Sequence, residues 1–204
     1  MSREGVGRWA NVARVTDPER HTHPRSPGET LVLVDEESSG TVLRVVTDQA
    51  ATLMDSVTVL LHRLGVGYLS LTHSADAETA ESAIAVHLLP PVNHRALAEA
   101  ERLLPMVVAD ARQVAADSAA LTARVRELAD QMDVDDGARF PGPDRADVAA
   151  LLRWLLDGHF VVLGAVSCAV DGGEARADEA SRLGVARLRT EVLPQLTSAD
   201  QLLV

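Results

Sequence analysis

The sequence predicts an α+β fold: a ferredoxin-like β-α-β-β-α sheet with its helices on one face. Three observations support this prediction. Two β-branched apolar runs, Thr41–Thr47 and Val66–His73, flank a segment in which apolar residues recur at helical spacing. A further run, Ala83–Leu89, alternates larger and smaller side chains as a strand with one buried face does. An alanine-rich stretch over 94–132 then has the composition of helix.

The first elements are expected to be a hairpin and then a helical crossover. Thr30–Asp35 is a short apolar strand, and the polar residues up to Gly40 are few enough for a hairpin into Thr41–Thr47. The apolar positions of the following helix share one face: Leu53, Val57, Leu60, Leu61 and Leu64. Gly65 suits the C-terminal cap of that helix. The strands on either side of the helix should run parallel, with a right-handed crossover.

The middle of the chain is expected to be helical but interrupted. Pro90-Pro91 ends the strand Ala83–Leu89. Within 94–132, Pro105 should kink or divide the helix, and Asp117 with Ser118 is placed to start another. Two or three helical pieces are therefore predicted rather than one rod.

After a linker-like stretch over 133–143, a second helix and strand are predicted. Asp144 is placed to cap a helix over Arg145–Leu156. Its expected buried face comprises Val148, Leu151, Leu152 and Leu155. The almost unbroken apolar run His159–Val170 predicts a central strand covered on both faces, with Cys168 buried in it. A short strand is expected within Arg182–Arg189.

Composition excludes several functional classes. The net charge of −11 argues against nucleic acid or an anionic membrane as partner. The sequence has neither a signal-peptide pattern nor an apolar run of the roughly 18 residues that a membrane span needs, which predicts a cytoplasmic location. Its single cysteine excludes an internal disulfide. All 19 basic residues are arginine, so a Schiff-base or phosphate-loop lysine is absent.

The titratable residues form no motif that predicts catalysis or metal binding. His62, His73, His87 and His159 belong to four different predicted elements, without an acidic partner at fixed spacing. The nucleophile elbow, the Cys-x-x-Cys pair and the His-Glu-x-x-His helix do not occur. No catalytic residue and no metal ligand is therefore assigned.

Two segments carry a family resemblance. In the first, Thr47-Asp48 ends a strand and the helix after it contains Met54-Asp55-Ser56-Val57. In the second, the helix of residues 151–156 leads into Asp157-Gly158-His159-Phe160 and then Leu163-Gly164. With these segments in this order, residues 30–204 resemble the N-terminal region of the large bacterial NAD-dependent glutamate dehydrogenases. Residues 1–29 lie outside the resemblance, and their Arg-, Pro-, His- and Gly-rich composition without a sustained period predicts a flexible arm. Because the family region is ACT-like, the resemblance implies an ACT-like domain with a helical extension over 30–132 and a second, incomplete ACT-like unit over 144–204.

The resemblance also draws attention to the turn after Thr47. ACT-type regulatory domains bind small ligands, usually amino acids, at the turn between the first strand and first helix, where backbone N–H groups can hold a carboxylate. The corresponding candidate ligand-binding residues are Asp48, Gln49, Ala50, Ala51 and Thr52. This turn lacks the glycine common in such domains, and Asp48 adds a negative charge. Both features favour a helix-capping role for Asp48 over ligand binding.

The leading hypothesis is a non-catalytic N-terminal regulatory and assembly segment of an NAD-dependent glutamate dehydrogenase, which when intact would convert glutamate to 2-oxoglutarate. The resemblance implies NAD in the full-length enzyme, no cofactor in this chain, and the remainder of the dehydrogenase polypeptide as partner. The alternative is a stand-alone ACT-type dimer that senses a free amino acid. A homo-oligomer is expected, with the strand around Ile84 and the run Gln201–Val204 as candidate contacts. A small enzyme in its own right is the least favoured class.

Overall fold

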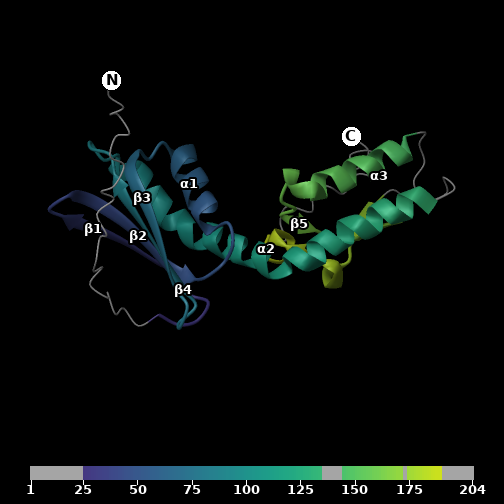
Figure 1. The fold of residues 1–204 in the computed structure, drawn as a ribbon, viewed down its shortest axis with the longest axis horizontal. Coiled ribbons are helices and arrows are strands. Elements are labelled where there is room, and N and C mark those ends of the chain that lie inside the picture. Colours follow the sequence, from purple (N-terminus) through teal and green to yellow (C-terminus); the bar gives the residue numbers. More distant parts are fainter. Residues whose placement is uncertain (1–24, 135–143, 172–173, 190–204) are drawn as a thin grey trace, which may run out of the picture.

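The computed structural model describes residues 25–134, 144–171 and 174–189. Figure 1 shows a sheet packed against helices at one end, a long helix leading away from it, and a smaller group of elements at the other end. The elements of the first group are β1 (Leu31–Glu37), β2 (Gly40–Asp48), α1 (Leu53–Leu64), β3 (Tyr68–Asp76) and β4 (Glu81–Leu88). Helix α2 (His94–Val134) also begins here, and we call the part that packs on the sheet, up to about Ala111, its first half.

The four strands form one antiparallel sheet in the order β1-β2-β4-β3. Val45 of β2 lies opposite Val32 of β1 and opposite Ile84 of β4. Because β2 and β3 are both antiparallel to β4, they run parallel to each other with β4 between them. The predicted α+β class, the β-α-β-β-α order and the parallel direction of the two strands around α1 are confirmed.

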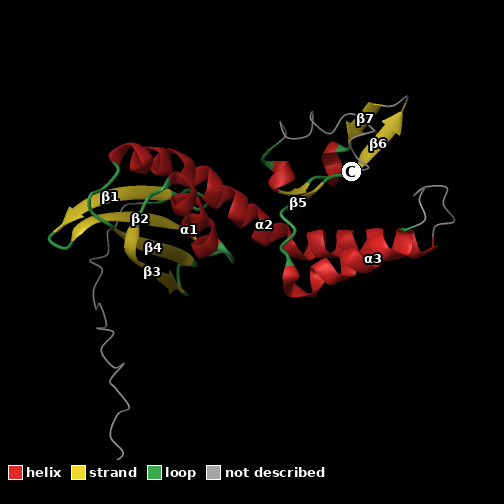
Figure 2. Ribbon diagram, turned by 90° about the horizontal axis from the view of Figure 1, so that it is seen from above, coloured by secondary structure: helices red, strands yellow, loops and turns green. Residues whose placement is uncertain are grey.

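One face of the sheet is covered by α1 and the first half of α2, as Figure 2 shows from above. The core between these layers is aliphatic. Its members of lowest exposure are Leu43, Val45, Leu53, Val57, Leu61, Ile84, Val86, Ala100, Leu104 and Val108. The core thus combines alternate residues of the central strands with one stripe of each helix, which is the layering expected for two faces that must bury each other.

Helix α1 matches its prediction closely. It spans Leu53–Leu64, and four of its five predicted apolar-face residues are buried. Gly65 has φ 70° and its N–H donates to the carbonyls of the last turn. A left-handed residue at this position ends the helix and favours glycine.

Helix α2 differs from its prediction, because it is a single helix of 41 residues that contains Pro105. A proline removes one backbone hydrogen bond and usually divides a helix. Here Leu104 and Val108, on either side of Pro105, are fully buried against the sheet and α1 and hold the helix in place. The predicted helix start at Asp117 is also wrong, because Asp117 lies inside α2.

Strand β4, around which a contact was expected, has no free edge. It lies between β2 and β3, and Ile84 is 1% exposed within the core. The other segment expected to contact a second copy, Gln201–Val204, lies outside the described residues.

The C-terminal elements are small and lie along the second half of α2 (Figures 1 and 2). They are α3 (Arg145–Trp154) with a π-helical turn over Leu155–His159, the strands β5 (Gly164–Ala165), β6 (Cys168–Asp171), β7 (Glu174–Ala177) and β8 (Leu183–Gly184), and 3-10 turns at Glu179–Ser181 and Val185–Arg187. Strand β5 pairs with β8, and β6 with β7, in two separate two-stranded ladders.

Two predictions in this part are wrong. The run after His159 is not one central strand, and Phe160, Val161 and Leu163 are 58–61% exposed. Cys168 is exposed as well. The predicted buried face of α3 is only partly covered: Leu152 and Leu155 are half-buried, whereas Val148 and Leu151 are exposed and Ala149 is buried instead. An apolar run without periodicity does not distinguish a covered strand from an exposed apolar segment.

Within the described ranges, no helix combines the length and the apolar character needed to cross a membrane. The predicted arm lies largely, and the predicted linker almost wholly, in the stretches 1–24 and 135–143, which are outside the described residues.

Candidate functional site

The predicted ligand turn joins β2 to α1. Asp48 is the last residue of β2, and the Gln49 N–H donates to the Ala80 carbonyl at 2.8 Å. Thr52 is the N-cap residue of α1, with φ 66°, and its side chain makes no capping hydrogen bond. Asp48 therefore does not cap the helix, and the predicted capping role is wrong.

The Asp48 carboxylate is held by two arginines and one backbone amide. Arg25 Nη1 lies 2.6 Å from Asp48 Oδ1, and Arg112 Nη2 lies 2.6 Å from Oδ2. The Gly28 N–H donates to Oδ2 at 2.9 Å. Arg25 also donates to Glu81 at 3.3 Å, so the group, which we call the Asp48 cluster, contains two positive and two negative side chains. It joins the segment before β1, the end of β2, the start of β4 and helix α2.

The environment of Asp48 stabilises its ionised form. Partial burial by itself would raise the pKa of Asp48, but hydrogen bonds from Arg25 and Gly28 and the charges of Arg112 and Arg25 outweigh it and lower the pKa below the ordinary aspartate value. Asp48 is 28% exposed at its side chain and the Arg25 side chain 7%. A carboxylate so engaged accepts hydrogen bonds from fixed donors, and it is poorly suited to act as a general base.

This arrangement changes the interpretation of the turn. Both guanidinium groups beside Asp48 are already paired with it, and Arg112 also donates to the Gly28 carbonyl at 2.6 Å. An incoming carboxylate would have to displace Asp48 from these two arginines. Of the other predicted turn residues, Ala50 packs against the core, while Ala51 and Thr52 are exposed.

A second polar group lies a short distance along α2. Asp117 accepts from the Gly184 N–H at 2.8 Å, from Arg187 Nε at 2.8 Å and from Gln113 Nε2 at 2.9 Å. The hydrogen bond from Gly184 is the main cause that lowers the pKa of Asp117, and it outweighs the effect of burial. Arg189 pairs with Asp110. These contacts fix the C-terminal elements to α2.

Gly184 is required where this second group forms. It has φ 59°, and a Cβ added there would lie 2.2 Å from the Leu163 carbonyl oxygen. We expect Gly184→Ala to lower the local stability by about 2 kcal/mol, because backbone rather than a flexible side chain occupies the space. Hydrogen exchange at the Val185 amide, which donates to Leu163 O at 2.8 Å, measures the effect.

Gly65→Ala is the matched control for Gly184→Ala. Gly65 also has positive φ, but nothing lies within 4 Å of its added Cβ. Gly65→Ala should therefore lower the local stability only by the cost of a left-handed alanine backbone, about 1 kcal/mol. Equal effects of the two substitutions would contradict the clash at Gly184.

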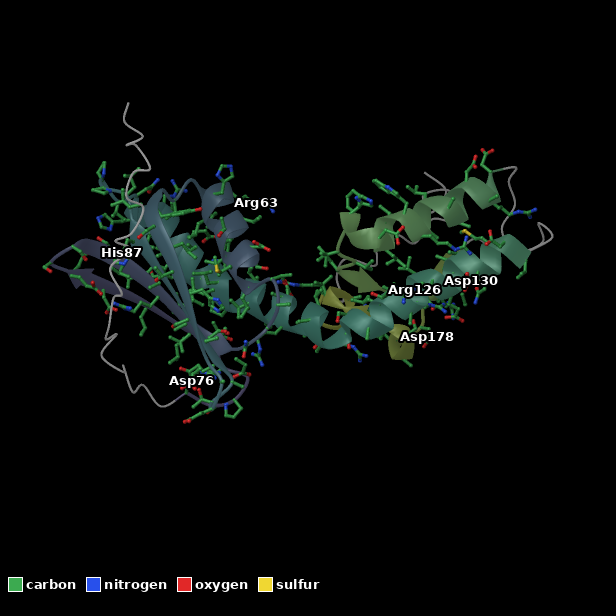
Figure 3. The ribbon with its side chains drawn as sticks, viewed as in Figure 1. Arg63, Asp76, His87, Arg126, Asp130 and Asp178 are labelled. Atoms are coloured by element: carbon green, nitrogen blue, oxygen red, sulfur yellow. The ribbon has the colours of Figure 1, made fainter. Side chains whose placement is uncertain are left out.

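Two histidines of the described residues have local partners on different elements. His73 Nε2 lies 3.2 Å from Ser82 Oγ at the edge of the sheet. His159 stacks on Trp154 with ring centroids 4.4 Å apart. Figure 3 labels His87 on the sheet, far from Arg126 and Asp130 on the second half of α2. Among the described residues, no group of three His, Cys, Asp or Glu side chains is arranged to hold a metal ion.

Sequence reasoning did not find the arginines that hold Asp48. Arg25 is 23 residues before Asp48 and Arg112 is 64 residues after it, so no local spacing connects them. Arg25 and Gly28 also fall in the stretch 1–29, which was predicted to be an arm.

No family model matches the chain, but two curated proteins of the same description are similar to it. The chain is 41% identical to an NAD-specific glutamate dehydrogenase of Mycobacterium tuberculosis over 205 residues, which cover 88% of this chain and 13% of that protein. It is 28% identical to an NAD-specific glutamate dehydrogenase of Pseudomonas aeruginosa over 177 residues, 74% of this chain and 11% of that protein. This chain is homologous to the N-terminal region of large NAD-specific glutamate dehydrogenases and spans about an eighth of the length of these relatives.

Proposed function

We propose that this chain is a non-catalytic, ACT-like N-terminal segment of an NAD-dependent glutamate dehydrogenase, with a role in assembly and control of that enzyme. The observation that carries the proposal is the similarity itself: it covers 88% of this chain but only 13% of the M. tuberculosis relative. In such an enzyme the oxidation of glutamate with NAD would take place elsewhere in the polypeptide, and this segment would act on it through contacts.

Three features of the chain support a role without chemistry of its own. The residues with strongly held charges, Asp48 and Asp117, are each bound by arginine and backbone N–H donors and tie elements of the chain together. Within the described ranges, the polar partners found for Asp48 are arginines and a backbone amide, whereas His73 pairs with Ser82 and His159 stacks on Trp154. The sequence also lacks lysine, which glutamate dehydrogenases as a class use in catalysis.

The two polar groups on α2 support a role in control. Arg112 holds Asp48 at the turn, whereas Asp110 and Asp117 hold Arg189, Gly184 and Arg187 of the C-terminal elements. Residues 110–117 occupy about 10 Å of one continuous helix. A displacement of Asp48 would therefore act on the same two turns of α2 that hold the C-terminal elements, and a rigid helix transmits such a change.

The proposal is tested in a dehydrogenase. The region of the M. tuberculosis relative that is homologous to this chain is deleted in one variant and replaced by this chain in another. We expect the deletion to reduce glutamate-dependent NADH formation and to change the oligomeric state, and the replacement to restore both. The isolated chain should form no NADH from glutamate and NAD.

Two outcomes of this experiment would contradict the proposal. One is a deletion that leaves both activity and oligomeric state unchanged, because an assembly segment cannot be dispensable. The other is turnover by the isolated chain, which would make it an enzyme in its own right.

A further inference from the structure

An exposed apolar surface follows helix α3 and the residues after it. Its members are Val148, Leu151, Trp154, Phe160 and Val161, which are 40–61% exposed. Val148, Leu151 and Trp154 follow one another at intervals of three on α3 and share one side of the helix. The Trp154 ring lies 5.8 Å from that of Phe160 and stacks on His159 at 4.4 Å. We call these five residues the α3 surface.

The fold of the described chain leaves this surface uncovered. Helix α3 lies beside the second half of α2 in both Figures 1 and 2, and it contributes Ala149 to the contact. A pair of helices buries only the sides that face each other, so the opposite side of α3 needs a further partner. The chain has five aromatic side chains of the Phe, Trp and Tyr types, and two of them meet here, where an interface would use them.

The size of the surface fits a dimer. The exposed parts of its five side chains amount to on the order of 500 Å² of apolar area. A standard interface buries about 800 Å² per partner, and about 65% of a homodimer interface is apolar, which again gives on the order of 500 Å². A two-fold interface uses the same surface on both copies, so the α3 surface by itself supplies the apolar part that each side needs.

Charge also favours a second copy at this place. A chain with a net charge of −11 repels its own copies over most of its surface. The five residues of the α3 surface carry no charge, and the nearby Arg153 is paired with Asp130 at 2.8 Å and with Asp133. Two α3 helices packed antiparallel about a two-fold axis would also bring opposite ends of their dipoles together.

We propose that the α3 surface is the two-fold interface between two copies of this chain. Leu151 and Trp154 lie at its centre and Phe160 closes one end. The interface does not depend on the dehydrogenase assignment, and its failure would leave the deletion experiment above unaffected.

The test is sedimentation equilibrium of the full chain over a range of concentrations, together with two matched variants. Leu151→Glu adds one negative charge to the α3 surface, at a residue 51% exposed. Val59→Glu adds the same charge to an exposed position of α1, at a residue 65% exposed. We expect a monomer–dimer equilibrium that Leu151→Glu weakens by at least about tenfold and Val59→Glu leaves unchanged. In a Trp9→Phe background, the emission of Trp154 should shift to shorter wavelength as the dimer forms.

Three results would overturn the proposal. The first is a wild-type chain that stays monomeric up to about 200 μM, since an interface of this size supports micromolar affinity. The second is equal weakening by the two variants, which would indicate overall repulsion. The third is a dimer that survives both Leu151→Glu and Trp154→Glu with circular dichroism unchanged, which would place the contact on another surface.

Discussion

Replacing Leu104 by alanine is expected to lower the free energy of unfolding by about 3 kcal/mol. Leu104 is fully buried where α2 packs on the sheet and on α1. Its loss removes apolar contacts and leaves a cavity beside Pro105, where α2 already lacks one backbone hydrogen bond. Urea unfolding followed by circular dichroism measures the change.

Met106→Ala is the control for Leu104→Ala. Met106 lies on the same helix, two residues away, and is 42% exposed. Its replacement should change the free energy of unfolding by less than about 0.5 kcal/mol. If the two substitutions had the same small effect, the packing of the first half of α2 on the sheet would be contradicted.

Asp48→Asn is expected to destabilise the fold by about 2 kcal/mol at neutral pH, because Arg25 and Arg112 lose the charge that pairs with them. The pKa of Asp48 is lowered in the folded chain. Its stabilising effect is therefore fully present above the unfolded pKa, about 4, and is lost as the pH falls through the folded pKa. The difference between wild type and variant, measured by urea unfolding, should shrink toward zero at strongly acidic pH.

Glu99→Gln provides the comparison for Asp48→Asn. Glu99 pairs with Arg102 on the exposed side of α2, three residues apart. Exposed pairs of this kind contribute little, so no measurable change in unfolding is expected. A difference between wild type and Asp48→Asn that stays constant down to strongly acidic pH would contradict a role for the Asp48 charge.

Local patterns predicted the first half of the fold well. The C-terminal end of α1, the buried stripe of Leu53, Val57 and Leu61, and the cap at Gly65 all follow from residues close together in sequence. The alternation around Ile84 likewise identified a strand with one buried face. These elements could be predicted because each one's own periodicity agrees with the packing it meets.

Features set by distant contacts could not be predicted in the same way. Pro105 stays inside one helix because the neighbours of Leu104 and Val108 come from other elements. Asp117 has the sequence of a helix start, but its carboxylate binds Gly184 and Arg187, 67 and 70 residues away. The partners of Asp48 were missed for the same reason, and only the fold brings them together.

The central claim is that this chain acts through a larger dehydrogenase rather than by sensing an amino acid on its own. Thermal unfolding of the isolated chain against a panel of free amino acids tests it most directly. Binding to the folded state at about a hundred times the dissociation constant would add about 2.7 kcal/mol of stability. We predict no rise in the unfolding midpoint with any amino acid, because Asp48 occupies both arginines beside the turn. A concentration-dependent rise with one or two amino acids would contradict the claim and identify a stand-alone sensor.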